Sequence, residues 1–312
     1  TCPMCSSVLH TNYHINSKSR SSIKKPFKIW RVKMTISEKV RKLSENFKLS
    51  SRGLAIPVTF LILFVSLMTV ISATYYFAVA RINSKSKSLN VAAAEQNMIL
   101  LESKVSSITW NEKSSAAYIF DDCGGTIKVE PSTVKLSINI SADGLNEEIY
   151  DYFIGKVVYE LPSADTVDIG LYLKGDFRVI VNKSGSTMTK LFITSGAEKP
   201  EIILYYRPMV SIVDGGLQDG KPLNILRIYI INMNSSQNFQ SQGEIPIKIS
   251  CLDVVSILRS YNFSSQIANL SVNVRLNGEE GQVSVPISSN QNGAILQVEL
   301  VVCQIRIARE GL

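Results

Sequence analysis

Hydrophobic residues are distributed unevenly along the chain, and one uninterrupted apolar segment lies near the N-terminus. Residues 54–80, LAIPVTFLILFVSLMTVISATYYFAVA, are 27 residues without a charged side chain. As a helix this segment spans roughly 40 Å, more than the ~30 Å hydrocarbon core of a bilayer. The pattern predicts one transmembrane helix rather than a buried helix of a soluble core. The residues expected to mark the span are Leu54, Pro57, Phe60, Leu63, Tyr75, Tyr76 and Ala80, with the tyrosines in an interfacial aromatic belt.

A helical period continues beyond the apolar segment. Between residues 81 and 112, hydrophobic side chains recur every three or four positions, which places them on one face of a helix. This packing stripe consists of Val91, Ala94, Met98, Leu101, Val105 and Ile108. We predict that the membrane helix extends outside the bilayer as a stalk to about Ile108. So narrow a stripe needs one partner surface, which would be the following domain or a neighbouring subunit; the alternative is a short coiled-coil stalk.

From residue 113 to residue 312 the period changes from helical to alternating, as is typical of strands. The clearest turn signals are Asn277-Gly278, which predicts a hairpin, and Asn292-Gly293, which precedes the strand expected at Ala294–Ile307. Pro246 and Pro286 indicate edge strands or bulges. We predict an all-β, β-sandwich-like domain of about ten strands in two antiparallel sheets.

Three segments of this domain are harder to assign. Leu171–Val181 is expected to form two short strands around Lys174-Gly175-Asp176, and Val254–Arg259 to form one or two helical turns. A split into two smaller β-domains near Asp214–Lys221 remains an alternative.

The distribution of charge predicts the orientation of the membrane segment. The chain has a net charge of +7, but residues 1–80 carry 12 Lys/Arg against 2 Asp/Glu, whereas residues 81–312 carry 21 against 24. Positive charge stays on the cytoplasmic side of a membrane. We therefore expect a basic cytoplasmic arm at residues 1–53, a single pass through the cytoplasmic membrane, and an outer β-rich domain. Basicity confined to the arm also argues against nucleic acid as a partner.

The sequence at the start of the apolar segment suggests processing. Ser51-Arg52-Gly53 precedes Leu54-Ala55-Ile56-Pro57-Val58, and this junction resembles the N-terminus of type IV pilin-like proteins, above all archaeal prepilins and minor pilins. The resemblance covers about residues 50–110. It implies that a prepilin-type peptidase cuts between Gly53 and Leu54, and that the apolar helix then joins other pilin-like subunits, or copies of itself, in a surface filament or pseudopilus. Met34 would begin a compact leader, which would leave residues 1–33 untranslated.

The resemblance leaves alternatives. Many pilins carry Glu at the fifth position after the cut, where this chain has Val58. A minor subunit or a permanently anchored adhesion module therefore fits as well as a major subunit. Ordinary secretory cleavage is the other reading of the apolar segment, which is longer than the 7–15 residues typical of a signal peptide.

Cysteines and sequons suggest covalent modification of the outer domain. We prefer Cys251 and Cys303 as a disulfide pair, against an alternative of three free buried thiols. Five Asn-x-Ser/Thr sequons could accept glycans: Asn139, Asn182, Asn234, Asn262 and Asn269.

Chemistry that needs imidazole is excluded from the outer domain, because both histidines of the chain lie in the arm. There, Cys2, Cys5, His10 and His14 have the spacing of a zinc knuckle, although a solvated arm is the simpler interpretation. Asp121-Asp122-Cys123-Gly124-Gly125 is read as a turn. We expect no enzyme activity and no cofactor; an anchored hydrolase built on distant carboxylates is the remaining catalytic alternative.

Overall fold

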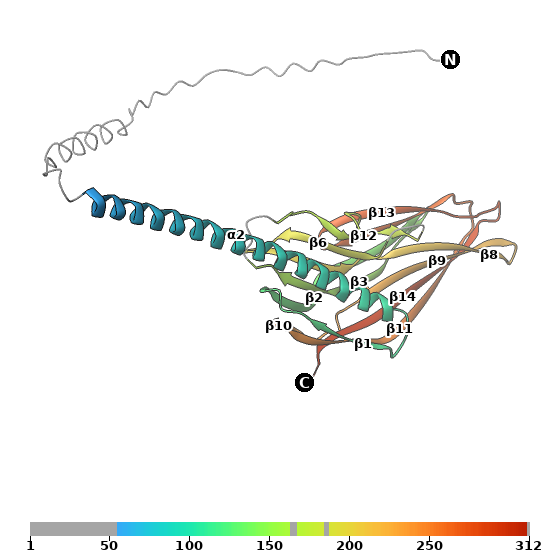
Figure 1. Ribbon diagram of the computed structural model, residues 1–312. Coiled ribbons are helices and arrows are strands. Elements are labelled where there is room, and N and C mark those ends of the chain that lie inside the picture. Colours follow the sequence, from blue (N-terminus) through green and yellow to red (C-terminus); the bar gives the residue numbers. More distant parts are fainter. Residues whose placement is uncertain (1–54, 163–166, 184–186, 311–312) are drawn as a thin grey trace, which may run out of the picture. The chain divides into compact units, whose positions relative to one another are not determined.

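The computed structural model describes residues 55–162, 167–183 and 187–310, which form one long helix followed by fourteen strands (Figure 1). The helix, α2, runs without interruption through 54 residues, Ala55–Ile108. Pro57 is compatible with its first turn, where a missing N–H leaves no helical hydrogen bond unmade. The helix ends as the stripe predicted, and Trp110 just beyond it has a left-handed φ of 70°.

The strands form two sheets. The six-stranded sheet has the order β1 (Ser115–Phe120), β11 (Ile245–Phe263), β14 (Ala294–Arg309), β9 (Lys221–Asn232), β8 (Met209–Gln218) and β5 (Val181–Asn182). The eight-stranded sheet has the order β13 (Glu279–Pro286), β12 (Asn269–Leu276), β2 (Thr126–Ala142), β3 (Leu145–Glu160), β7 (Pro200–Tyr206), β6 (Thr189–Ser195) and β4 (Tyr172–Lys174), with β10 (Phe239–Gln242) paired to β2. The all-β prediction for this domain is confirmed.

The predicted hairpin turn and one predicted edge strand are also confirmed. Asn277 and Gly278 connect β12 to β13 with φ values of 52° and 85°, as a two-residue hairpin turn with positive φ at both positions requires. β13, which contains Pro286, is an edge strand of its sheet. Pro tolerates an edge because its missing N–H would face no neighbouring strand.

Two details of the predicted domain are wrong, and the alternative of two smaller β-domains is excluded. Val254–Arg259 is extended within β11, because it pairs along its whole length with β14. The strands are not all antiparallel, since β9 pairs in parallel with β14 and β5 with β8. The two short strands expected at Leu171–Val181 are present as β4 and, at the end of the segment, β5, and they belong to different sheets. Asp214–Lys221 is no domain boundary, since it forms the tip of the β8–β9 hairpin.

The long strands bury their side chains in two successive cores. In β14, even-numbered residues from Ala294 to Val302 enter one core, and odd-numbered residues from Cys303 to Ile307 enter the other. Successive side chains of a strand point to opposite faces, so opposite faces are covered at the two ends of β14. The first core contains the packing stripe of α2 together with residues of both sheets, and the second contains residues of strands and of their connections, with none from α2.

Candidate membrane segment and helix cradle

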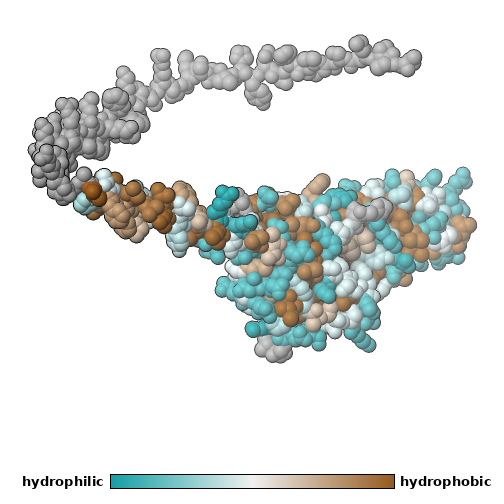
Figure 2. All heavy atoms as spheres, in the orientation of Figure 1, coloured by the Kyte–Doolittle hydropathy of each residue, from teal (hydrophilic) through white to brown (hydrophobic). Residues whose placement is uncertain are grey.

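The first half of α2 exposes an apolar surface. Among the described residues, α2 alone is long and apolar enough to cross a membrane, with a mean hydropathy of 2.3 over its most apolar window. All side chains from Ile56 to Leu89 are exposed, and Figure 2 shows hydrophobic residues gathered along the start of the helix. Phe60, Leu63, Tyr75 and Tyr76, four of the residues expected to mark the span, all belong to this exposed surface. Such a surface needs an apolar environment.

Three hydroxyl groups in this segment are satisfied within the helix. Thr59 donates to the Ile56 carbonyl at 2.9 Å, Ser66 to Leu63 at 2.9 Å, and Thr69 to Val65 at 2.8 Å. Bonds of this kind hide polar atoms from an apolar solvent, where an unpaired hydroxyl costs several kcal/mol. The segment is therefore chemically compatible with a bilayer along its described length.

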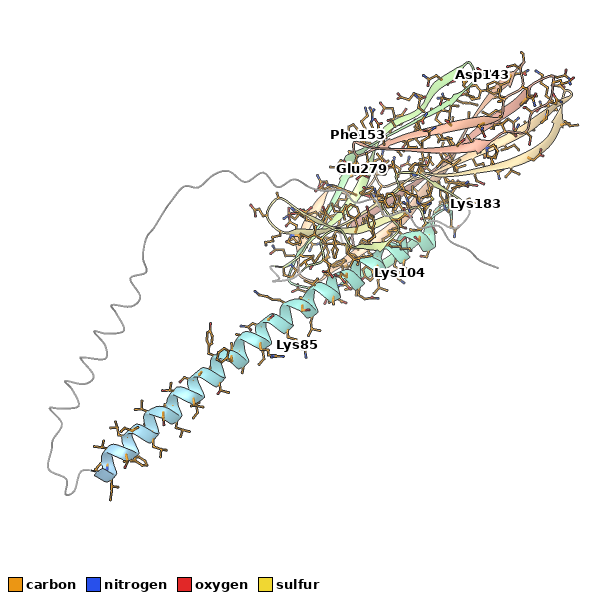
Figure 3. The ribbon with its side chains drawn as sticks, turned by 90° about the horizontal axis from the view of Figure 1, so that it is seen from above. Lys85, Lys104, Asp143, Phe153, Lys183 and Glu279 are labelled. Carbon is orange, nitrogen blue, oxygen red and sulfur yellow. The ribbon has the colours of Figure 1, made fainter. Side chains whose placement is uncertain are left out.

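The second half of α2 lies in a cradle of strands. Figure 3 shows Lys85 on the part of the helix before the strands and Lys104 on the part that runs beside them. All six stripe residues, Val91, Ala94, Met98, Leu101, Val105 and Ile108, are buried in the first core. The partner surface of the stripe is thus the β-domain of the same chain.

A buried carboxylate fixes the helix in this cradle. Glu102 is fully buried, and its carboxylate forms an ion pair with Lys174 of β4. Thr189 of β6 and Ser106 of α2 each donate a hydrogen bond of 2.6 Å to Oε1 of the same carboxylate. Burial, with a smaller effect of this carboxylate, raises the pKa of Tyr206 well above its usual value. Because Lys174 and Thr189 come from separate strands, they define both the rotation and the height of the helix.

The sequence patterns did not reveal this anchor. The available signal was its spacing: Glu102 lies four residues after Met98 and three before Val105, on the buried face. A carboxylate at such a position requires a cation, and Lys174 comes from a segment 72 residues away. No local pattern links the two.

A second buried charge organises the strands beside β4. The Arg207 side chain is fully buried and forms an ion pair with Asp176. It also donates to the Thr187 carbonyl at 2.9 and 3.1 Å and to the Arg178 carbonyl at 2.7 Å. Hydrogen bonds from Arg178 and Arg207 hold the pKa of the Asp176 carboxyl well below its usual range.

A third polar contact ties α2 to the turn after β1. Asn97 donates to the Asp121 carbonyl at 3.3 Å and to the Cys123 thiol at 3.2 Å, and it accepts a bond of 3.0 Å from Tyr118. Gly124 N–H donates to the Asp122 carboxylate at 2.8 Å, and Gly124 has a φ of 74°. The Asp-Asp-Cys-Gly-Gly cluster is therefore a turn that docks on the helix.

The structure brings Cys251 and Cys303 together. Both thiols are buried, and their Sγ atoms lie 3.5 Å apart on neighbouring strands of the six-stranded sheet. All three cysteines among the described residues are free thiols here, so the predicted disulfide is absent from this structure. Burial raises the pKa of the Cys303 thiol to about 12. Cys251 and Cys303 are thus in contact through their thiols without a covalent bond.

The sequons differ in accessibility. Asn182, Asn234, Asn262 and Asn269 are exposed. Asn139 is only half-buried but lies within β2, between β3 and β12, and its Oδ1 is buried without a hydrogen-bond partner. Asn139 is therefore the least accessible of the five sequons, whereas the side chains of the other four face solvent.

The described residues form no candidate metal site. They contain no group of three or more His, Cys, Asp or Glu side chains that could hold a metal ion. A polar cavity of about 560 Å³ lies over β2, β3, β12 and β13; its lining includes Ser137, Asn139, Glu148, Asn273, Arg275 and Gln282. Here Arg275 pairs with Glu280 on the adjacent strand, which gives both charges a structural partner.

Several sequence predictions fall outside the described residues. They are the cleavage position Gly53–Leu54, the leader beginning at Met34, and the zinc-like cluster Cys2, Cys5, His10 and His14. For Ala55 the backbone alone is described.

Comparison with known proteins adds no relative. No family model matches the chain, and no curated protein or solved structure is significantly similar to it.

Proposed function

We propose that this chain is a single-pass, membrane-anchored surface subunit of the type IV pilin-like class. The observation that carries the proposal is the continuity of α2. One helix combines an exposed apolar segment with a buried stripe that is built into a β-domain. In this proposal Gly53–Leu54 is cut by a prepilin-type peptidase, and the apolar helices then pack against one another in a filament or pseudopilus.

The cradle supports this role mechanically. A subunit held only by its N-terminal helix must pass any load on the β-domain into that helix. The buried stripe and the Glu102 ion pair would transmit this load without allowing the helix to rotate. Function then lies in assembly and display, with no catalytic step.

A permanently anchored adhesion module is the second candidate. Val58 favours it, because the carboxylate that aligns subunits in many pilins is missing from the described part of the apolar segment, Ile56–Ala80. In this case the helix stays in the bilayer, and the β-domain binds its target as a single copy.

The N-terminal residue of the mature protein distinguishes the two candidates. We would determine it by intact mass and peptide mapping from native membranes, for the parent chain and for Gly53→Leu. The pilin-like proposal expects a start at Leu54 in the parent and an uncut chain in the variant. An uncut parent, or equal processing of both chains, would reject it and leave the permanent anchor.

A further inference from the structure

β11 has a long edge without a neighbouring strand. It pairs with β14 from Ile247 to Phe263, but on its other side β1 covers only Ile245–Ser250. Cys251 still exchanges backbone hydrogen bonds of 2.9 Å with Lys113 and Ser114, and at the far end the Phe263 carbonyl accepts a bond of 3.0 Å from Lys221. Between them, no strand in the described part of the chain pairs with the edge of Leu252–Asn262.

The side chains on this free edge are unusually apolar. Leu252, Val255, Ile257 and Leu258 are between 41% and 60% exposed. Natural proteins protect free edges with charges, Pro or bulges, because an unprotected edge recruits another strand. One edge strand of the other sheet, β13, carries Glu279, Glu280 and Pro286. In residues 252–262 the only charges are Asp253 and Arg259, and the one bulge lies at the start, at Leu252, so the centre of this edge around Ile257 has neither a charge nor a Pro.

We propose that this edge pairs, antiparallel and around a two-fold axis at Ile257, with the same edge of a second copy of the chain. The axis follows from the length of the free edge. Its eleven residues have Ile257 at their centre, so pairing around Ile257 uses the whole edge and places Leu252 opposite Asn262. A centre closer to Leu252 would drive the end of β11 into β1 of the other copy.

Charge complementarity supports a second copy as the occupant. With Ile257 at the axis, Arg259 lies opposite Val255 of the other copy and diagonal to its Asp253, and diagonal neighbours are about 7–8 Å apart, within reach of a long side chain. Arg259 already forms an ion pair with Glu147, and Asp253 takes part in no ion pair of the described residues. No like charges face each other, and the two-fold symmetry closes the assembly at a dimer.

This inference is independent of the membrane helix and does not rest on the proposed function. It gives the β-domains of two copies a direct contact, in which the six-stranded sheet of one copy continues into the same sheet of the other. Cleavage after Gly53 and pairing at Ile257 can each be present without the other.

The test is cysteine cross-linking of the full chain in membranes with a mild oxidant. In Ile257→Cys the two thiols would lie directly opposite, with Cα atoms about 5 Å apart, within disulfide range. Ser260 is an exposed position on the same edge. In Ser260→Cys the two introduced cysteines would be offset along the paired strands by six residues, which separates them by roughly 20 Å. The parent chain with its five cysteines sets the background.

We expect a disulfide-linked dimer for Ile257→Cys and only background for Ser260→Cys. Equal cross-linking of both variants, no dimer for Ile257→Cys, or a ladder of larger species would overturn the proposal. A second test places Asp253→Arg and Arg259→Asp, singly and together, in the Ile257→Cys chain. Each single change should reduce the dimer, and the double exchange should restore it; failure of the double exchange would equally reject the pairing.

Discussion

The carboxylate of Glu102 on α2 forms an ion pair with the ammonium group of Lys174 on β4 across the boundary between helix and sheet. Glu102 has no exposed side-chain surface, whereas Lys174 is 38% exposed. The lysine can therefore be hydrated without its partner, but the glutamate is shielded from water and depends on Lys174, Thr189 and Ser106. This asymmetry predicts that Glu102 is the residue of the pair that cannot do without its partner.

Glu102→Ala should lower the free energy of unfolding by about 2–4 kcal/mol, since it leaves the buried Thr189 hydroxyl without its acceptor and removes the hydrogen bond from Ser106. Lys174→Ala should also destabilise the chain, because it leaves the carboxylate buried without a cation. Urea unfolding in detergent can be followed by the fluorescence of Trp110, which packs edge-on against Tyr229 at 5.4 Å. Glu112→Ala, at an exposed position just beyond the helix, is the control and should change stability by less than about 0.5 kcal/mol.

The packing stripe offers a matched pair of neighbouring leucines. Leu101 is fully buried, and Leu100 is 41% exposed. Leu101→Ala should cost about 2–5 kcal/mol, because the cavity it leaves lies in the first core. Leu100→Ala should cost far less, since water already reaches that side chain. Similar losses for the two variants, measured in the same urea titration, would contradict the burial of the stripe.

The elements that the sequence predicted well are those coded by local patterns. The end of α2 followed from the spacing up to Ile108, and the β12–β13 hairpin from Asn277-Gly278. Val254–Arg259 shows the limit of this approach: its apolar spacing also fits a helix, and only pairing with β14, some 40 residues later, makes it a strand. The Glu102 anchor was hidden for the same reason, because its partners lie on β4 and β6.

The contact between Cys251 and Cys303 predicts an intramolecular disulfide under oxidation. With copper–phenanthroline and oxygen as the oxidant, the two thiols would lose two hydrogens and join the sulfur atoms that now lie 3.5 Å apart. Because the bond would close a loop of 52 residues, we expect it to raise stability by about 2–4 kcal/mol. Peptide mapping should find this linkage in Cys123→Ser and lose it in Cys303→Ser. Linkage of Cys123 to either partner would show that the thiols are arranged differently.

The stability of the chain should pass through a maximum in mildly acidic solution. Hydrogen bonds from Arg178 and Arg207 lower the pKa of Asp176, and a hydrogen bond from Arg227 lowers the pKa of Glu299. A depressed folded-state pKa contributes stability that is present above the unfolded pKa, near 4, and is lost as the pH falls through the folded value. Protonation of these two carboxyls should therefore destabilise the domain below about pH 4.

Two other carboxyls act in the opposite direction. Burial raises the pKa of Glu95, with a smaller effect of Asp168, and burial together with the nearby Glu160 raises that of Glu201. A raised folded-state pKa contributes stability that is fully present below the unfolded pKa and is lost as the pH rises. We therefore expect the melting temperature of the full chain in detergent to rise from neutral pH towards about pH 5 and to fall below about pH 4. In Asp176→Asn the melting temperature should fall less below about pH 4, with its change between pH 5 and neutral pH retained. In Glu201→Gln only the change between pH 5 and neutral pH should become smaller. If the melting temperature of Asp176→Asn falls below about pH 4 as steeply as that of the parent, protonation of the Asp176–Arg207 pair is not the cause of the acid destabilisation.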